Sequence, residues 1–118
     1  MQKFPRRWTD KDKIDFLQRK VIINSIIYYE LNTSKMTDRE YDELSRQLVD
    51  MQKDYPDISN TQYGYVMYDF DGTTGFDLYS RLNDKDKAYL KNIAQHITGI
   101  GKKKETKNPS KVTKRRLF

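Results

Sequence analysis

The sequence contains no cysteine, a single histidine, three prolines and five glycines. Without cysteine the chain has no disulfide, no thiolate metal site and no cysteine nucleophile. No apolar run approaches the roughly 20 residues that a membrane-spanning helix needs, and no secretory hydrophobic segment follows the N-terminus. We therefore expect a soluble, cytoplasmic protein that does not enter a membrane.

The composition limits the size of the hydrophobic core. The chain has 118 residues, of which 36% are hydrophobic and 34% are charged. That length corresponds to one domain, and a chain of this size buries about two-thirds of the surface that its unfolded form exposes. Long polar stretches are therefore expected to lie outside the folded part.

The positive charge is concentrated at one end of the chain. The net charge is +6, yet residues 101–118 carry eight basic side chains and one acidic side chain, so the remainder is close to neutral. With few apolar residues, this segment cannot offset the entropy cost of ordering, which predicts a flexible, disordered tail. The tail either increases solubility or contacts DNA phosphates. The candidate residues for nucleic-acid contact are Lys102, Lys103, Lys104, Lys114, Arg115 and Arg116.

The first half of the chain predicts two helices. Apolar residues recur at helical spacing over about 10–31, which indicates the first helix. The sequence TDRE at 37–40 matches the S/T-x-x-E capping box and marks the start of the second. That helix should end near Asp54, because Pro56 disfavours helical geometry in the residue before it. Joined by a short loop, the two helices should form an antiparallel hairpin.

The second half predicts a β-hairpin and a further helix. Aromatic and apolar residues alternate over two faces within 63–79, around the turn sequence DGTTG at 71–75. An isolated hairpin is marginal in water, so it must pack on the helices. Apolar residues at helical spacing predict a third helix over about 84–98, ended by Gly99.

Together these elements predict a mainly α fold with a minor β part, of the α+β class. An antiparallel helical hairpin is joined by a β-hairpin and a third helix. We expect an N-terminal arm at 1–8, a domain at 9–100 and the basic tail at 101–118.

One segment resembles a known module. The paired tyrosines Tyr28 and Tyr29 are followed by MTDREYDEL at 36–44 and by KDYP at 53–56. This pattern is similar to the N-terminal Ia domain of bacterial NAD-dependent DNA ligases, a helical hairpin with paired aromatics near the end of one helix and a D-x-E-Y-D sequence opening the next. The resemblance covers about residues 17–62. It implies a stand-alone ligase-Ia-like protein, and the small size, the flexible basic end and the missing catalytic half suggest that a phage or prophage encodes it.

The resemblance also implies a binding site. In that family the Ia domain clamps the nicotinamide mononucleotide half of NAD against a separate nucleotidyltransferase domain. The matching positions in this sequence are Tyr28, Tyr29, Asp38, Tyr41 and Asp42. Tyrosine rings stack on a flat cationic ring, and carboxylates accept hydrogen bonds from ribose hydroxyls. A structural role stays open, because an acid at position 38 suits a helix N-terminus and Tyr41 begins the apolar stripe of its helix.

Catalytic motifs are missing or have a simpler explanation. The K-x-D-G lysine motif of the ligases is absent, so we expect no ligation by this chain alone. The sequence VMYDFDGT at 66–73 matches the opening motif of haloacid-dehalogenase-type phosphatases, but the 45 residues that follow are too few for a parallel α/β sheet. The single histidine, His96, falls late in the predicted third helix and we assign it no role, and the sequence contains no metal-ligand or hydrolytic-triad motif. We expect no enzyme activity, no metal and no cofactor, apart from a possible nicotinamide mononucleotide or NAD.

Three functions are consistent with these features. The leading hypothesis is a non-catalytic interaction protein, a phage accessory protein that regulates or inhibits a host NAD-using enzyme, such as a DNA ligase or an NAD-consuming defence protein. The second is a module that binds NAD or nicotinamide mononucleotide in trans with a ligase adenylylation domain. The third is a DNA accessory protein that acts through its basic tail.

Overall fold

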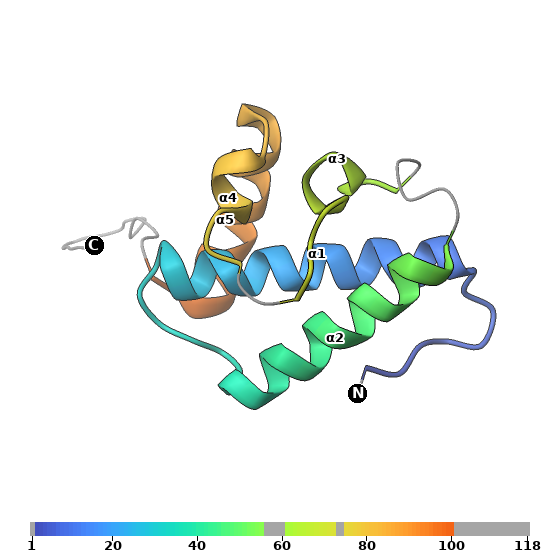
Figure 1. The fold of residues 1–118 in the computed structure, drawn as a ribbon. Coiled ribbons are helices and arrows are strands. Elements are labelled where there is room, and N and C mark those ends of the chain that lie inside the picture. The colour runs from blue at the N-terminus through green and yellow to red at the C-terminus, as the bar shows by residue number, and fades with distance from the viewer. Residues whose placement is uncertain (1, 56–60, 73–74, 101–118) are drawn as a thin grey trace, which may run out of the picture.

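The structure, a computed structural model, describes residues 2–55, 61–72 and 75–100. Within these residues the chain forms five helices (Figure 1). They are α1 (Asp10–Tyr29), α2 (Asp38–Asp54), α3 (Gly64–Met67), α4 (Leu78–Arg81) and α5 (Asp84–Thr98). The basic tail, with Lys102, Lys103, Lys104, Lys114, Arg115 and Arg116, lies outside the described residues.

Helix α1 begins with a reciprocal cap and ends two residues earlier than predicted. The hydroxyl of Thr9 accepts a hydrogen bond from the amide of Asp12 at 3.1 Å, and the Asp12 carboxylate accepts one from the Thr9 amide at 3.0 Å. At the other end Glu30 is the cap residue. Asn32 has a φ of 56°, a left-handed conformation that ends helical geometry.

Helix α2 has the predicted start and end. Thr37 and Glu40 form the capping box, with the Glu40 carboxylate 2.8 Å from the Thr37 amide and the Thr37 hydroxyl 3.1 Å from the Glu40 amide. Such a box satisfies two amides that lack a partner within the helix. The helix ends at Asp54, as expected from the proline two residues later.

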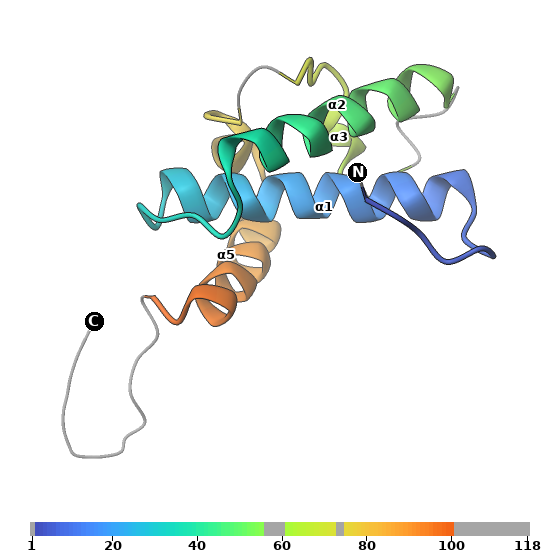
Figure 2. The ribbon, with the colours of Figure 1, turned by 90° about the horizontal axis from the view of Figure 1, so that it is seen from below.

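Helix α1 forms the centre of the fold. Helix α2 runs antiparallel to it, and α5 crosses it on the side away from α2 (Figure 2). Because α1 packs against neighbours on opposite sides, it has apolar residues around most of its circumference. Its buried hydrophobic side chains are Ile14, Leu17, Val21, Ile22, Ile23, Ile26 and Ile27.

The predicted β-hairpin over 63–79 is wrong. The described residues contain no strand, and the short helices α3 and α4 occupy this region instead. The side chains buried in its first part are Tyr63, Val66, Met67 and Phe70. They are spaced as one face of a helix, whereas strict alternation would have buried every second residue. Six of the eight residues over 63–70 are apolar or aromatic, so this sequence is compatible with both periods, and packing against the other helices selects the helical one.

Helix α5 has the bounds predicted for the third helix. Asn83 caps its start by accepting a hydrogen bond from the amide of Asp86 at 2.8 Å. Gly99 has a φ of 72° and donates its amide to the carbonyl of Gln95 at 2.7 Å. This left-handed cap is the conformation that glycine adopts without a steric penalty.

A buried glutamine joins three segments of the chain. The side-chain amide of Gln18 donates to the side chains of Gln52 and Thr61, both at 3.0 Å, while its oxygen accepts from the amide of Tyr63 at 3.3 Å. These bonds connect α1 to α2 and to the chain that enters α3. Within the described part of the chain, no helix is long and apolar enough to cross a membrane.

Candidate functional site

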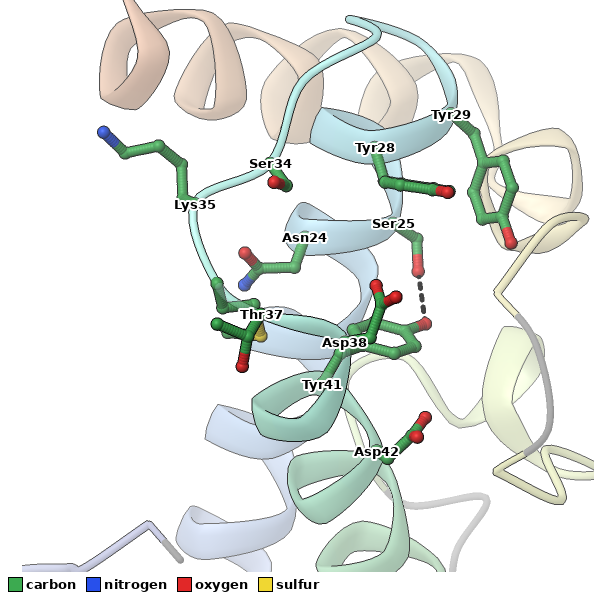
Figure 3. A pocket seen from close by; sticks show the side chains of 11 residues that line it. Asn24, Ser25, Tyr28, Tyr29, Ser34, Lys35, Thr37, Asp38, Tyr41 and Asp42 are labelled. Atoms are coloured by element: carbon green, nitrogen blue, oxygen red, sulfur yellow. Dashed lines mark hydrogen bonds between the residues drawn. The ribbon is translucent and has the colours of Figure 1, made fainter.

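A cavity of about 270 Å³ lies where the end of α1, the following loop and the start of α2 meet (Figure 3). All five site residues predicted from the resemblance line it. The complete lining is Asn24, Ser25, Tyr28, Tyr29, Ser34, Lys35, Met36, Thr37, Asp38, Tyr41 and Asp42. The structure therefore brings the predicted residues together around one cavity.

The antiparallel packing of two helices builds this cavity. Tyr28 and Tyr29 lie in the last turn of α1. Asp38, Tyr41 and Asp42 lie at the start of α2 with spacings of three and four residues, which places their side chains on one face. The loop between the helices is short, so the end of one and the start of the next must lie side by side.

The two tyrosines of α1 form an edge-to-face pair. Their ring centroids are 4.8 Å apart and the rings are inclined at 89°. Tyr28 is 54% exposed and Tyr29 is 37% exposed, so both rings keep accessible surface at the cavity. Two perpendicular aromatic rings at a cavity edge offer a face and an edge to a flat ligand.

Tyr41 forms a fixed wall of the cavity. Its hydroxyl lies 2.8 Å from the hydroxyl oxygen of Ser25, and the Ser25 hydroxyl donates to the carbonyl of Val21 at 2.9 Å. Burial raises the pKa of the Tyr41 hydroxyl, and the hydrogen bond with Ser25 offsets part of that increase. The ring also packs against the hydrophobic core. Tyr41 therefore has the structural role that the sequence left open, packing on the core, and it also lines the cavity.

Asp38, Asp42 and Lys35 give the cavity its charges. Both carboxylates are exposed and extend from α2 in Figure 3, whereas Lys35 lies on the loop. Asp38 is also the first residue after the cap of α2, a position where the helix dipole favours an acid. The site can thus accept hydrogen bonds and attract positive charge near the tyrosines.

Sequence reasoning missed the remaining residues of the lining. Asn24 and Ser25 precede Tyr28 and Tyr29 by four residues each, so the helical period could have identified them. Ser34 and Lys35 lie in the loop, where no periodicity marks the side chains that turn toward a cavity.

The apparent phosphatase motif has a structural explanation. Arg81 pairs with Asp69, the first acid of that motif, and with Asp77 at 3.0 Å. The hydrogen bond and charge of Arg81 hold the pKa of the Asp69 carboxyl below its usual range. Among the described residues, no group of three or more His, Cys, Asp or Glu side chains is placed to hold a metal ion. His96 lies late in α5, outside the cavity lining.

The fold and the cavity thus define a helical hairpin with paired tyrosines and carboxylates at one end. Residues 8–62 match the family described as DNA ligase-like, N-terminal NAD+-binding domain. A DNA ligase from Endomicrobium trichonymphae is 35% identical over 46 residues, which are 39% of this chain and 7% of that ligase. The comparison with solved structures gave no match. Residues 8–62 therefore form a ligase-Ia-like domain, as the resemblance predicted, whereas α3, α4 and α5 lie beyond the match.

Proposed function

We propose that this chain is a non-catalytic module that binds the nicotinamide mononucleotide half of NAD and acts together with a separate NAD-using protein. The observation that carries the proposal is that the same cavity is lined by all five residues, Tyr28, Tyr29, Asp38, Tyr41 and Asp42. These residues come from two helices and converge on one side of the hairpin. The family name, which specifies an NAD+-binding domain, supports the same ligand.

The size and chemistry of the cavity suit half of a dinucleotide. Ligand pockets commonly measure about 300–1,000 Å³, and this cavity, at about 270 Å³, is slightly smaller than that range. Tyrosine rings suit a flat cationic ring, and the two exposed carboxylates suit ribose hydroxyls and the ring charge. Lys35 at the same cavity offers a cation for a phosphate group.

Each residue has a distinct role in this proposal. Tyr28 and Tyr29 contact the ring, while Tyr41 limits the depth of the cavity. Asp38 and Asp42 accept hydrogen bonds from the sugar. NAD supplies an activated adenylyl group when it is bound, and the K-x-D-G lysine that would receive this group is absent here. The module therefore orients a nucleotide and leaves any reaction to its partner.

The partner in this proposal is an NAD-using enzyme, such as a host DNA ligase or an NAD-consuming defence protein. The exposure of Tyr28, Asp38 and Asp42 supports this role, since a ligand held by them keeps one side accessible to a partner. Exposed aromatic side chains outside the cavity add contact area, with Tyr68 65% and Phe76 71% exposed. Regulation or inhibition of that enzyme by a phage accessory protein is the finer form of the hypothesis and remains a prediction.

Calorimetric titration with nicotinamide mononucleotide tests the proposed ligand. We expect Asp38→Asn to weaken binding by roughly 10- to 100-fold, because hydrogen bonds to charged groups contribute about 1.5–3 kcal/mol. Asp84→Asn is the matched control, since Asp84 is also the first residue of its helix but lies outside the cavity lining. It should bind like the unmodified protein. No heat at millimolar nicotinamide mononucleotide would exclude this function.

A further inference from the structure

A segment beyond the family match lies against the cavity. The match ends at residue 62, and the chain returns to the end of α1 just before α4. Figure 3 shows this pale yellow segment passing beside Tyr29. Gly75 and Phe76 belong to it, and each contacts residues that line the cavity.

Phe76 continues the aromatic pair of α1. Its ring centroid lies 5.6 Å from that of Tyr29 at an angle of 82°, and Tyr29 meets Tyr28 in the same edge-to-face manner. Phe76 is 71% exposed, so burial in the core does not account for its position. The three rings thus form a row of edge-to-face contacts in which Tyr29 meets both of the other rings.

Gly75 lies against Ser25 and Tyr41, two residues of the cavity lining. A methyl group at this position would overlap the hydroxyl oxygens of both Ser25 and Tyr41, and it would lie 3.0 Å from the Ser25 Cβ. Glycine is required here for close approach, because any larger residue would force apart the hydrogen-bonded pair that holds the Tyr41 ring.

We propose that Gly75 and Phe76 are positioning residues of the cavity, and that they adapt the ligase-Ia-like hairpin to hold a planar aromatic ring without a second domain. Gly75 packs the Ser25–Tyr41 pair in place, and Phe76 fixes the Tyr29 ring against Tyr28. The identity of the ring as nicotinamide rests on the proposed function. The positioning itself is a property of the free protein.

Substitution of Phe76 tests the ring row. Phe76→Ala should shift the ring-proton resonances of Tyr29 in the free protein and weaken nicotinamide mononucleotide binding by about three- to ten-fold, the scale of one aromatic pair. Phe76→Tyr should restore both, whereas Phe76→Leu should restore neither. Tyr89→Ala removes another exposed aromatic, on α5 and outside the cavity lining, and should change neither readout.

Substitution of Gly75 tests the contact with the Ser25–Tyr41 pair. Gly75→Ala should shift the Tyr41 ring resonances and weaken binding. In a Ser25→Ala, Tyr41→Phe background, which lacks the two overlapping oxygens, Gly75→Ala should cause a smaller loss of affinity for nicotinamide mononucleotide. Unchanged Tyr29 and Tyr41 resonances in Phe76→Ala and Gly75→Ala would overturn the proposal. If the unmodified protein fails to bind nicotinamide mononucleotide while these resonances shift as expected, the proposed function fails and the positioning stands.

Discussion

At the scale of single residues, the buried hydroxyl of Tyr63 makes the stability of the fold depend on pH. The side chain is fully buried, and its hydroxyl has no hydrogen-bond partner among the described residues. Burial, with a smaller contribution from the charge of Asp86, raises the pKa of this hydroxyl to about 12. In the unfolded chain a tyrosine has a pKa of about 10. The folded state therefore favours the neutral phenol.

Tyr63→Phe should alter stability in two ways. Removing an unsatisfied buried hydroxyl should raise the free energy of unfolding at pH 7 by about 1 kcal/mol. In the unmodified protein, ionisation of Tyr63 does not affect the free energy of unfolding below pH 10. Between pH 10 and pH 12 this free energy decreases, because the Tyr63 hydroxyl ionises more readily in the unfolded chain than in the folded one. The Tyr63→Phe variant should lack this part of the decrease in the free energy of unfolding at alkaline pH.

Urea denaturation followed by circular dichroism between pH 7 and pH 12 measures both effects. Tyr89→Phe, at an exposed position of α5, should keep the decrease. Identical alkaline curves for the unmodified protein and Tyr63→Phe would show that ionisation of Tyr63 does not contribute.

At the scale of secondary structure, local signals were reliable and periodicity in a short apolar stretch was not. The capping box at Thr37 and the glycine cap at Gly99 occupy the predicted positions, because their hydrogen bonds join residues within four positions of each other. The helical region 64–67 was misread as a strand. The carbonyl of Met67 accepts a hydrogen bond from the Gln52 side chain of α2 at 3.2 Å, and that of Val66 accepts one from Arg81 of α4 at 3.0 Å. The local sequence does not specify such contacts.

Gln18 is the residue through which these elements are joined, and Gln18→Leu tests its importance. The substitution preserves approximate volume but removes bonds to Gln52, Thr61 and Tyr63. Leaving buried polar groups unpaired should lower the free energy of unfolding by about 1–3 kcal/mol. Chemical denaturation measures the change. Gln95→Leu, at a partly exposed position of α5, should be within ~0.5 kcal/mol of the unmodified protein. A fully stable Gln18→Leu variant would contradict this role.

At the scale of the whole molecule, the chain combines a nearly neutral body with a strongly basic end. The predicted contribution of residues 101–118 to DNA binding is separate from that of the cavity, because the two regions carry different chemistry. Truncation after residue 100 should remove salt-dependent DNA binding while it leaves nicotinamide mononucleotide binding unchanged.

Capture experiments can separate these two surfaces. Full-length and truncated chains, used as bait in a nuclease-treated bacterial lysate, should retain the same NAD-using enzyme, identified by mass spectrometry. Asp38→Asn should retain less of it, whereas Asp84→Asn should behave like the unmodified bait. Retention of proteins that do not use NAD, or retention that depends only on the tail, would contradict a partner at the cavity.

The sequence by itself determined the limits of α2 and α5, the first residue of α1 and the relationship of residues 8–62 to the ligase Ia domain. Each of these depends on residues close together in the chain or on a motif with fixed spacing. Only the tertiary structure decided that 64–67 is helical and that Gly75 and Phe76 lie against Tyr41 and Tyr29. These features depend on contacts between separate segments of the chain, such as Phe76 with Tyr29 and Met67 with Gln52, which no local pattern encodes.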